Sequence, residues 1–150
     1  MKRAALLLTF TLGFSAAAAF AADTPDTLAG AMLVDAAKAK SLQDAGARII
    51  DTRVAAEYAE AHIKGAISVP YKEKSAKAAD FDAKQDDVPG FLGKLDGAAK
   101  KDDKLIFQCN GPECWKSYKG SKAALGAGYK HVFWFRGGIP EWKAKGLPTE

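Results

Sequence analysis

Residues 104–115 read KLIFQCNGPECW, and this stretch decides the fold. Leu105-Ile106-Phe107 is typical of a buried strand, Asn110-Gly111-Pro112-Glu113 predicts a turn, and a helix is expected from Trp115 to Leu125. A strand that leads through a short loop into a helix is the repeating unit of a parallel sheet. The stretch also places Cys109 at the carboxyl end of its strand, which is the edge where open α/β sheets bind ligands.

The same alternation continues on both sides of this stretch. Residues 71–87 are rich in Lys, Ala and Asp and predict a surface loop or a solvated helix. We therefore expect one α/β domain, with a small parallel sheet of about five strands and helices on both faces. Further strands are expected at residues 47–50, 67–69 and 132–135, and further helices at residues 35–43, 54–61, around Phe91 to Leu95, and 140–145.

Composition and charge exclude several classes of protein. Hydrophobic residues make up 48% of the 150 residues, which is too many for a disordered chain and suits one globular domain. The formal net charge is +4, and it falls to +2 without Lys2 and Arg3. Because Lys and Asp alternate without a block of one sign, the charge pattern gives no support for nucleic-acid binding. A mildly positive surface still favours small anions.

The N-terminal segment has the pattern of a secretory signal peptide. Lys2 and Arg3 precede an apolar run, and the run ends in Ala19-Phe20-Ala21, which supplies small residues at the cleavage site. We predict a signal peptide at residues 1–21, cleavage after Ala21, and a mature domain at residues 22–150 in the periplasm, with no membrane contact after cleavage. The alternative is an uncleaved membrane anchor, although the apolar run is shorter than the ~20 residues of a bilayer span.

The only cysteines, Cys109 and Cys114, are too few for a disulfide scaffold and too close together to constrain the unfolded chain strongly. Their proximity is better explained by chemistry, because loop N–H groups and the free N–H groups of a following helix can stabilise a thiolate or hold an anion. Two alternatives stay open. In the first, Cys109 is only a small buried hydrophobic residue. In the second, the two cysteines belong to a zinc site, although His62 and His131 are isolated and the spacing of the cysteines is loose for zinc.

Two groups of residues together resemble the rhodanese-like domain family. The first is Ile49–Arg53, Glu57-Tyr58 and the run His62–Pro70. The second is Cys109 after a strand, Gly128-Tyr129 before Val132, and Gly137-Gly138 before Trp142 and Gly146-Leu147-Pro148. The resemblance covers nearly all of residues 22–150 in the right order. It implies a rhodanese-like fold.

The resemblance also implies a sulfurtransferase. Cys109 would take a sulfane sulfur from thiosulfate or a polysulfide, and a thiol or protein acceptor would then attack the outer sulfur of the Cys109 persulfide. Such a reaction needs no metal and no organic cofactor. The oligomeric state stays open. The loop implied to surround the substrate anion consists of Asn110, Gly111, Pro112, Glu113, Trp115, Lys116 and Ser117.

The loop departs from the family pattern, in which an Arg often stands five residues after the nucleophile. Cys114 occupies that position here, so the loop reads C-x4-C-W. Lys116 and Lys119 are the nearest cations that could replace the Arg, although lysines on a helix are more often solvated. Glu113 is expected to weaken thiosulfate binding. Cys114-Trp115 is similar to the CxxCW motif of some periplasmic rhodanese-like proteins, but the first Cys of that motif would fall on Gly111.

Cys114 adds a second chemical possibility, because its thiol can attack a Cys109 persulfide, release sulfide and leave a disulfide. One competing function is a thiol–disulfide redox protein in which both cysteines cycle without carrying sulfur. Another is a catalytically silent binding module on the same fold. A phosphatase or arsenate reductase ranks last, because no Arg follows Cys109 until Arg136.

Four residues of the first motif are expected to support the site rather than react. Arg53 and Glu57 are one helical turn apart and are predicted to pair, and Asp51 is predicted to bind nearby backbone N–H groups. His62 is predicted to be structural rather than a general base. The aromatic residues Phe133 to Phe135 are predicted to belong to the core.

Overall fold

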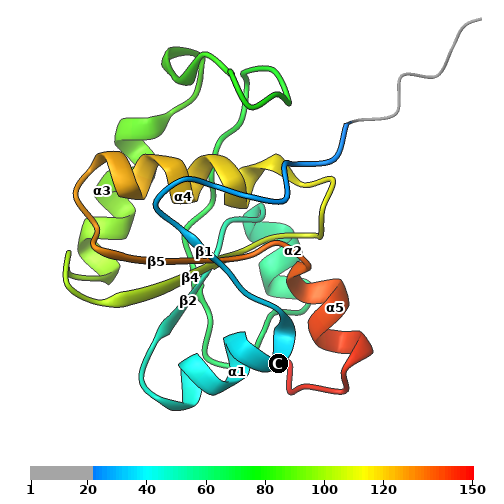
Figure 1. Cartoon of the computed structure of the whole chain (residues 1–150). Helices are drawn as coiled ribbons and strands as arrows, with labels where there is room; N and C mark the ends of the chain where they lie inside the picture. The colour runs from blue at the N-terminus through cyan, green and yellow to red at the C-terminus, as the bar shows by residue number, and fades with distance from the viewer. Residues whose placement is uncertain (1–21) are drawn as a thin grey trace, which may run out of the picture.

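The structure, a computed structural model, describes residues 22–150, and the predicted signal peptide lies outside this range. Five parallel strands form one sheet in the order β1-β5-β4-β2-β3 (Figure 1). The parallel α/β architecture predicted from the sequence is therefore confirmed. The strands are β1 (Met32–Leu33), β2 (Arg48–Asp51), β3 (Ile67–Ser68), β4 (Lys104–Gln108) and β5 (His131–Phe135). The helices are α1 (Ala36–Asp44), α2 (Ala55–Glu60), the short 3-10 helix η1 (Ala83–Gln85), α3 (Val88–Ala98), α4 (Trp115–Gly126) and α5 (Gly138–Ala144).

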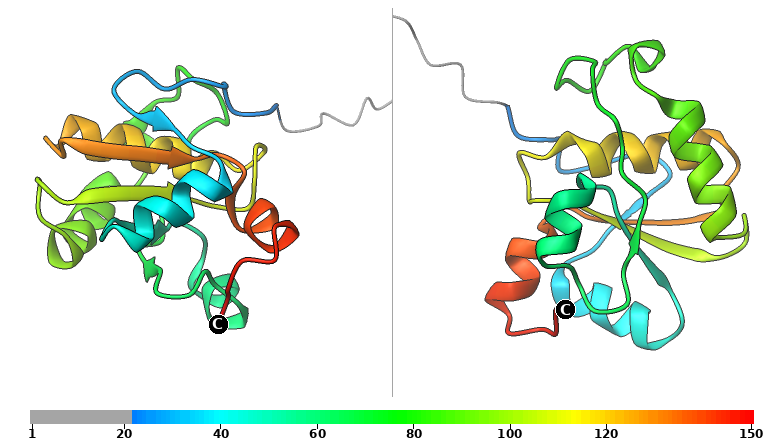
Figure 2. Two further views of the ribbon diagram at one scale, coloured as in Figure 1. Left: turned by 60° about the horizontal axis from the view of Figure 1, so that its bottom comes forward. Right: turned by 180° about the vertical axis from the view of Figure 1, so that it is seen from behind.

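Helices cover both faces of the sheet, as Figure 2 shows from two further directions. On one face, Phe91 and Leu95 of α3 pack in a cluster that includes Phe107 of β4. On the other face, Trp142 of α5 packs in a cluster that includes Ile106. Because successive residues of β4 point to opposite faces, this central strand is buried on both sides, which explains its unbroken apolar run.

The predicted helix boundaries agree with local capping interactions. The Asp35 carboxylate accepts a hydrogen bond from Lys38 N at 2.8 Å and caps α1, and Gly46 follows the helix with φ +95°. α3 starts at Val88, before the predicted helix around Phe91 to Leu95. The Asp87 carboxylate accepts a hydrogen bond from Gly90 N and caps the first turn. β1 is a two-residue edge strand in an apolar run for which the sequence analysis assigned no element.

Residues 71–87 form the predicted surface loop, and a buried carboxylate organises it. Asp86 accepts hydrogen bonds from the amides of Lys74 and Ser75, from the Ser75 hydroxyl and from the Tyr71 hydroxyl, at 2.6–2.9 Å. Burial disfavours the charge on Asp86, but these hydrogen bonds outweigh burial and lower the pKa of Asp86. Hydrogen bonds between its two ends therefore stabilise this loop, which has no apolar core of its own within the described residues. No helix within residues 22–150 is long and apolar enough to cross a membrane.

Candidate active site

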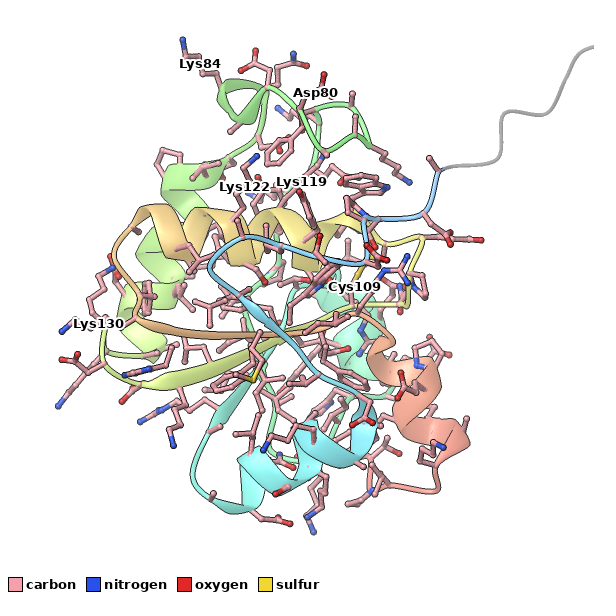
Figure 3. The ribbon with its side chains drawn as sticks, viewed as in Figure 1. Asp80, Lys84, Cys109, Lys119, Lys122 and Lys130 are labelled. Atoms are coloured by element: carbon pink, nitrogen blue, oxygen red, sulfur yellow. A yellow bond between two sulfur atoms is a disulfide. The ribbon has the colours of Figure 1, made fainter. Side chains whose placement is uncertain are left out.

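Cys109 lies where the sequence placed it, directly after β4 at the carboxyl edge of the sheet (Figure 3). Its side chain is buried, with 1% of the residue exposed. The Cys109 carbonyl accepts a hydrogen bond from Ile139 N at 3.0 Å, so the start of α5 closes against the back of the cysteine. Gly138 has φ +59°, and a Cβ there would press on the Cys109 carbonyl and lie 3.0 Å from Gly111 N. Only glycine fits this contact without displacing the loop.

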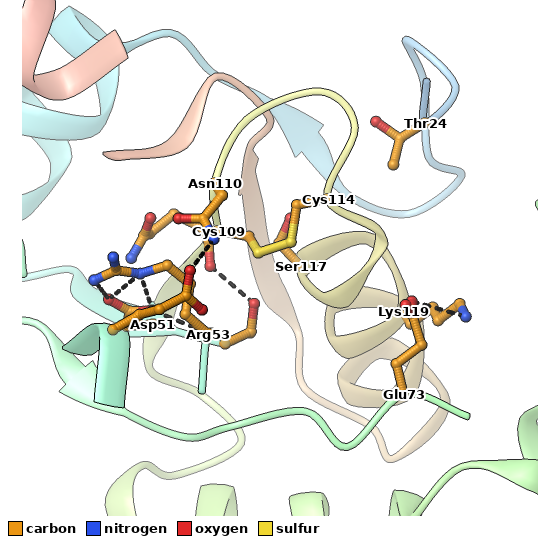
Figure 4. The surroundings of a disulfide bond; sticks show 12 residues. Thr24, Asp51, Arg53, Glu73, Cys109, Asn110, Cys114, Ser117 and Lys119 are labelled. Carbon is orange, nitrogen blue, oxygen red and sulfur yellow. Dashed lines mark hydrogen bonds and ion pairs between the residues drawn. A yellow bond between two sulfur atoms is a disulfide. The ribbon is translucent and has the colours of Figure 1, made fainter. Parts of the chain in front are cut away.

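The loop between β4 and α4 is closed by a disulfide bond between Cys109 and Cys114 (Figure 4). Gly111 has φ +109°, and Cys114 N donates to Gly111 O at 3.0 Å, which closes a tight turn. Cys114 is the N-cap residue of α4 and is partly exposed. Within residues 22–150, the amides of Asn110, Gly111 and Glu113 donate to no protein acceptor. The loop therefore carries N–H groups that remain available to an anion beside the sulfur atoms.

A short N-terminal arm, residues 22–24, lies across the outside of this loop. The amide and hydroxyl of Thr24 both donate to Pro112 O, at 2.8 and 2.7 Å. Arg136 binds the Thr24 carbonyl at 2.6 Å and the Thr24 hydroxyl oxygen at 3.0 Å. Trp115 Nε1 donates to Ala22 O at 2.8 Å. The arm thus stabilises the turn of the loop mainly through the hydrogen bonds of the buried Thr24.

A pocket of about 250 Å³ opens on the Cys114 side of the loop, and we call it the Cys114 pocket. Its walls come from two segments, the loop with the start of α4 and the surface loop of residues 71–87. Both signs of charge are present in its lining, which consists of Glu73, Lys77, Asn110, Glu113, Cys114, Trp115 and Lys116. Cys109 does not line it. The pocket is therefore open to Cys114 and closed to the buried sulfur behind it.

One of the two lysines considered as replacements for the missing Arg is not available to a substrate. Lys119 is fully buried on α4, and its ammonium group lies 2.9 Å from the Glu73 carboxylate and 2.8 Å from the Ser75 hydroxyl. It also lies over the Phe81 ring, 4.8 Å from the centroid. Figure 3 shows Lys119 and Lys122 rising from α4 toward the surface loop. Lys119 therefore fixes Glu73 and that loop, whereas Lys116 lines the Cys114 pocket.

The predicted pair of Arg53 and Glu57 is wrong. Asp51 is closer in the folded chain, and Arg53 Nε and Nη2 donate to its two carboxylate oxygens at 3.0 and 2.7 Å, with both side chains buried (Figure 4). Glu57 instead accepts from Asn110 Nδ2 at 2.6 Å and links α2 to the cysteine loop. Asp51 also accepts from Arg53 N, as predicted. Glu57 therefore supports the cysteine loop directly, whereas the ion pair of Asp51 and Arg53 holds the turn after β2 and binds Ala61 O.

His62 is in a structural position. Its ring stacks on Tyr58 at 3.8 Å between centroids, and its Nδ1 donates to Tyr58 O at 2.9 Å. Ser117 and Trp115 are buried rather than exposed on the loop. Ser117 Oγ accepts from Trp134 Nε1 at 3.1 Å, and Trp115 packs beside Tyr118. Trp134 and Phe135 are core residues, and Phe133 is partly buried against the core.

Sequence reasoning missed four contributors to the site. Thr24 and Glu73 come from segments without a motif, and no local signal links them to the loop. Lys77 lies in the surface loop, for which only solvent exposure was predicted. Gly138 was noticed as one of two adjacent glycines, but its contact with Cys109 was not, and its positive φ explains why glycine stands at that position.

Comparisons with known proteins agree with this geometry. The model of the family described as rhodanese-like domain matches residues 35–145. The protein HIGH ARSENIC CONTENT 1, mitochondrial, of Arabidopsis thaliana is 31% identical over 126 residues, covering 82% of this chain and 68% of that protein. Thiosulfate sulfurtransferase 16, chloroplastic, of the same plant is 31% identical over 106 residues, covering 71% of this chain and 82% of that protein.

Solved structures show the same fold. A crystal structure of the Alr3790 protein from Anabaena aligns with a TM-score of 0.60 and 25% identity, covering 78% of this chain and 90% of that chain. The thiosulfate sulfurtransferase from Pseudomonas aeruginosa aligns with a TM-score of 0.57 and 25% identity, covering 80% of this chain and 20% of that chain. By its family match, its relatives and its sheet, the chain belongs to the rhodanese-like domain family.

Proposed function

We propose that this protein is a sulfurtransferase or sulfur carrier that works through a persulfide on Cys109, which an external thiol or Cys114 then attacks. The observation that carries the proposal is the position of Cys109 at the carboxyl end of β4, in a loop where the amides of Asn110, Gly111 and Glu113 donate to no acceptor in residues 22–150. Membership of a family that includes thiosulfate sulfurtransferases supports the same reading. The disulfide adds that the Cys114 sulfur can reach the Cys109 sulfur within this fold.

The first step is attack by the Cys109 thiolate on a sulfane sulfur. With thiosulfate, the new S–S bond forms as the S–S bond of the donor breaks, and sulfite leaves with the electron pair. The product is a Cys109 persulfide whose terminal sulfur carries a negative charge. The loop amides and the first turn of α4 are the groups that can stabilise that charge.

The second step has two possible nucleophiles. An external thiol can attack the outer sulfur and carry it away as its own persulfide, which restores the Cys109 thiolate. Alternatively, the Cys114 thiolate attacks Cys109 Sγ and displaces hydrosulfide, so that both cysteines are oxidised to the disulfide and the sulfane sulfur is reduced to sulfide. A dithiol reductant must then reduce the disulfide before the next cycle.

The loss of the family's Arg beside Cys109 favours a polysulfide over thiosulfate as the donor. The family's Arg is absent, Lys119 is occupied by Glu73, and Glu113 adds a negative charge beside the loop. Lys116 and Lys77 are the cations that remain in the pocket. A doubly charged, compact anion loses more from this arrangement than a longer sulfur chain, whose charge is spread over its ends.

Location in the periplasm is part of the proposal. Its support is the signal-peptide pattern of residues 1–21, with cleavage after Ala21 and a mature domain at residues 22–150. A pair of cysteines that forms a disulfide also suits an oxidising compartment.

A specific observation favours a second candidate, a thiol–disulfide redox protein, because the two cysteines are already bonded to each other. The two candidates differ in whether the protein ever holds an extra sulfur atom. Mass spectrometry distinguishes them directly.

The test is the intact mass of the reduced mature protein after brief exposure to thiosulfate, and separately to polysulfide, followed by peptide mapping. We expect one added sulfur on Cys109 that cyanide removes, with polysulfide the better donor. Cys109→Ser should take up no sulfur. Cys114→Ser should keep the persulfide and release less sulfide. Formation of the disulfide without release of sulfide, together with no sulfur adduct on Cys114→Ser, would support the redox protein, and an unchanged mass would support a silent binding module.

A further inference from the structure

The two sulfur atoms of the disulfide differ in their access to solvent. Cys109 is 1% exposed and is covered by the start of α5, whereas Cys114 is partly exposed and lines the Cys114 pocket. We propose that the Cys114 pocket binds a small anionic thiol, and that this thiol reduces the disulfide by attacking Cys114 and expelling the Cys109 thiolate. The inference rests on the proposed function only in taking the disulfide as a state of the working protein.

The chemistry of exchange supports this direction of attack. A thiolate attacks one sulfur of a disulfide along the S–S bond, and the rate depends on which sulfur is accessible and on how well the other sulfur leaves. Here the accessible sulfur is Cys114. The leaving sulfur, Cys109, lies in the loop with unpartnered amides, where a thiolate is stabilised.

Reduction of the protein disulfide is balanced by oxidation of two external thiols. The incoming thiolate forms a mixed disulfide with Cys114, and the electron pair of the broken bond stays on Cys109 as a thiolate. A second thiol, either another molecule or the second group of a dithiol, then releases Cys114 and leaves with the first as a disulfide. Both cysteines end reduced, and two external thiols are oxidised.

The charges of the pocket point to an anionic thiol. Glu73 is paired with the buried ammonium group of Lys119, so these two charges cancel locally. Lys77 and Lys116 have no carboxylate within 4.0 Å in the described part of the chain, and Glu113 is the remaining acid. The pocket thus has one more free cation than free anion. Its volume of about 250 Å³ suits a small peptide-like thiol with carboxylates for the lysines and an ammonium group for Glu113.

The first experiment locates the attacked sulfur. The oxidised wild-type protein is mixed with glutathione, quenched with acid within seconds, alkylated and mapped by mass spectrometry. We expect glutathione on Cys114 and the alkyl group on Cys109. Glutathione on Cys109, or no glutathione adduct on Cys114, would overturn the proposal. No sulfur donor is present, so a failure to form a persulfide in the earlier test leaves this result unaffected.

The second experiment tests the charge preference of the pocket. Rates of disulfide reduction by glutathione and by the cationic thiol cysteamine are compared, each corrected for its thiolate fraction. We expect glutathione to be faster, and each of Lys77→Gln and Lys116→Gln to lower the ratio about threefold, which is the size of effect of an exposed charge. Lys84→Gln, on η1 and outside the pocket, is the matched control and should leave the ratio unchanged. The same ratio of glutathione rate to cysteamine rate in the wild type and all three variants would refute an anion-selective pocket.

Discussion

The contact between Gly138 and the back of Cys109 can be tested with one methyl group. Gly138→Ala places a Cβ against the Cys109 carbonyl and 2.9 Å from its carbon, at a residue with φ +59°. The left-handed backbone costs an alanine about 1–2 kcal/mol, and forcing a carbon into packed atoms costs about 1–3 kcal/mol more. We therefore expect Gly138→Ala to lower the free energy of unfolding by about 2–5 kcal/mol.

Gly146→Ala is the matched control for this substitution. Gly146 has φ +65°, so it has the same backbone requirement, but no atom of residues 22–150 outside its immediate neighbours lies within 4 Å of the added carbon. It should cost only the backbone component, about 1–2 kcal/mol. The assay is urea unfolding of the reduced proteins, followed by the fluorescence of the buried Trp134 and Trp142. Persulfide formation on Cys109 should slow in Gly138→Ala alone. Equal losses of stability in the two variants would refute the argument that Gly138 is required by contact with the cysteine loop.

Three further contacts can be tested by substitution. Lys119→Met leaves Glu73 without its partner and should cost about 3 kcal/mol in urea unfolding, and adding Glu73→Leu should recover most of that loss; additive losses would contradict an ion pair between them. Hydrogen bonds lower the pKa of Asp86, so its contribution to stability is present above its unfolded pKa and is lost as pH falls through the lower folded value. Asp86→Asn should therefore flatten the acid end of a stability profile from pH 6 to pH 2, and an unchanged profile would assign that dependence to other groups. Thr24→Val removes the hydrogen bond from the hydroxyl to Pro112 O and the one that the hydroxyl accepts from Arg136 Nε. It should cost about 2 kcal/mol and speed reduction of the disulfide, whereas Thr24→Ser should resemble the wild type in both measurements.

Much of the fold could be predicted because its signals are local. The apolar runs of β2, β4 and β5 and the cap at Asp35 each depend on a few adjacent residues. β1 was not assigned, since two residues carry no periodicity and its pairing with β5 is decided by the folded sheet. The parallel arrangement followed from the alternation of strands and helices rather than from any single element.

The site was predicted only where its residues are neighbours in sequence. Cys109 and Cys114 lie on one loop, so their meeting needed no knowledge of the fold. Arg53 was assigned to Glu57 because helical spacing was the only available guide, and the shorter reach to Asp51 depends on the turn after β2. Lys119 looked like a solvated cation on a helix face, and its burial comes from a loop more than 40 positions earlier that folds over it.

The cysteine loop is held from both ends of the chain. Thr24, which precedes the loop in sequence, binds it through hydrogen bonds to Pro112 O. Gly138 and Ile139, which follow it, pack against Cys109. During synthesis, β4 and both cysteines leave the ribosome before Gly138 and Ile139, which close the loop on its C-terminal side. The reactive arrangement is therefore completed only after the last helix has been made, and a chain truncated before α5 would keep its cysteines but lose the surroundings that direct their chemistry. The site can therefore form only in a domain that includes α5.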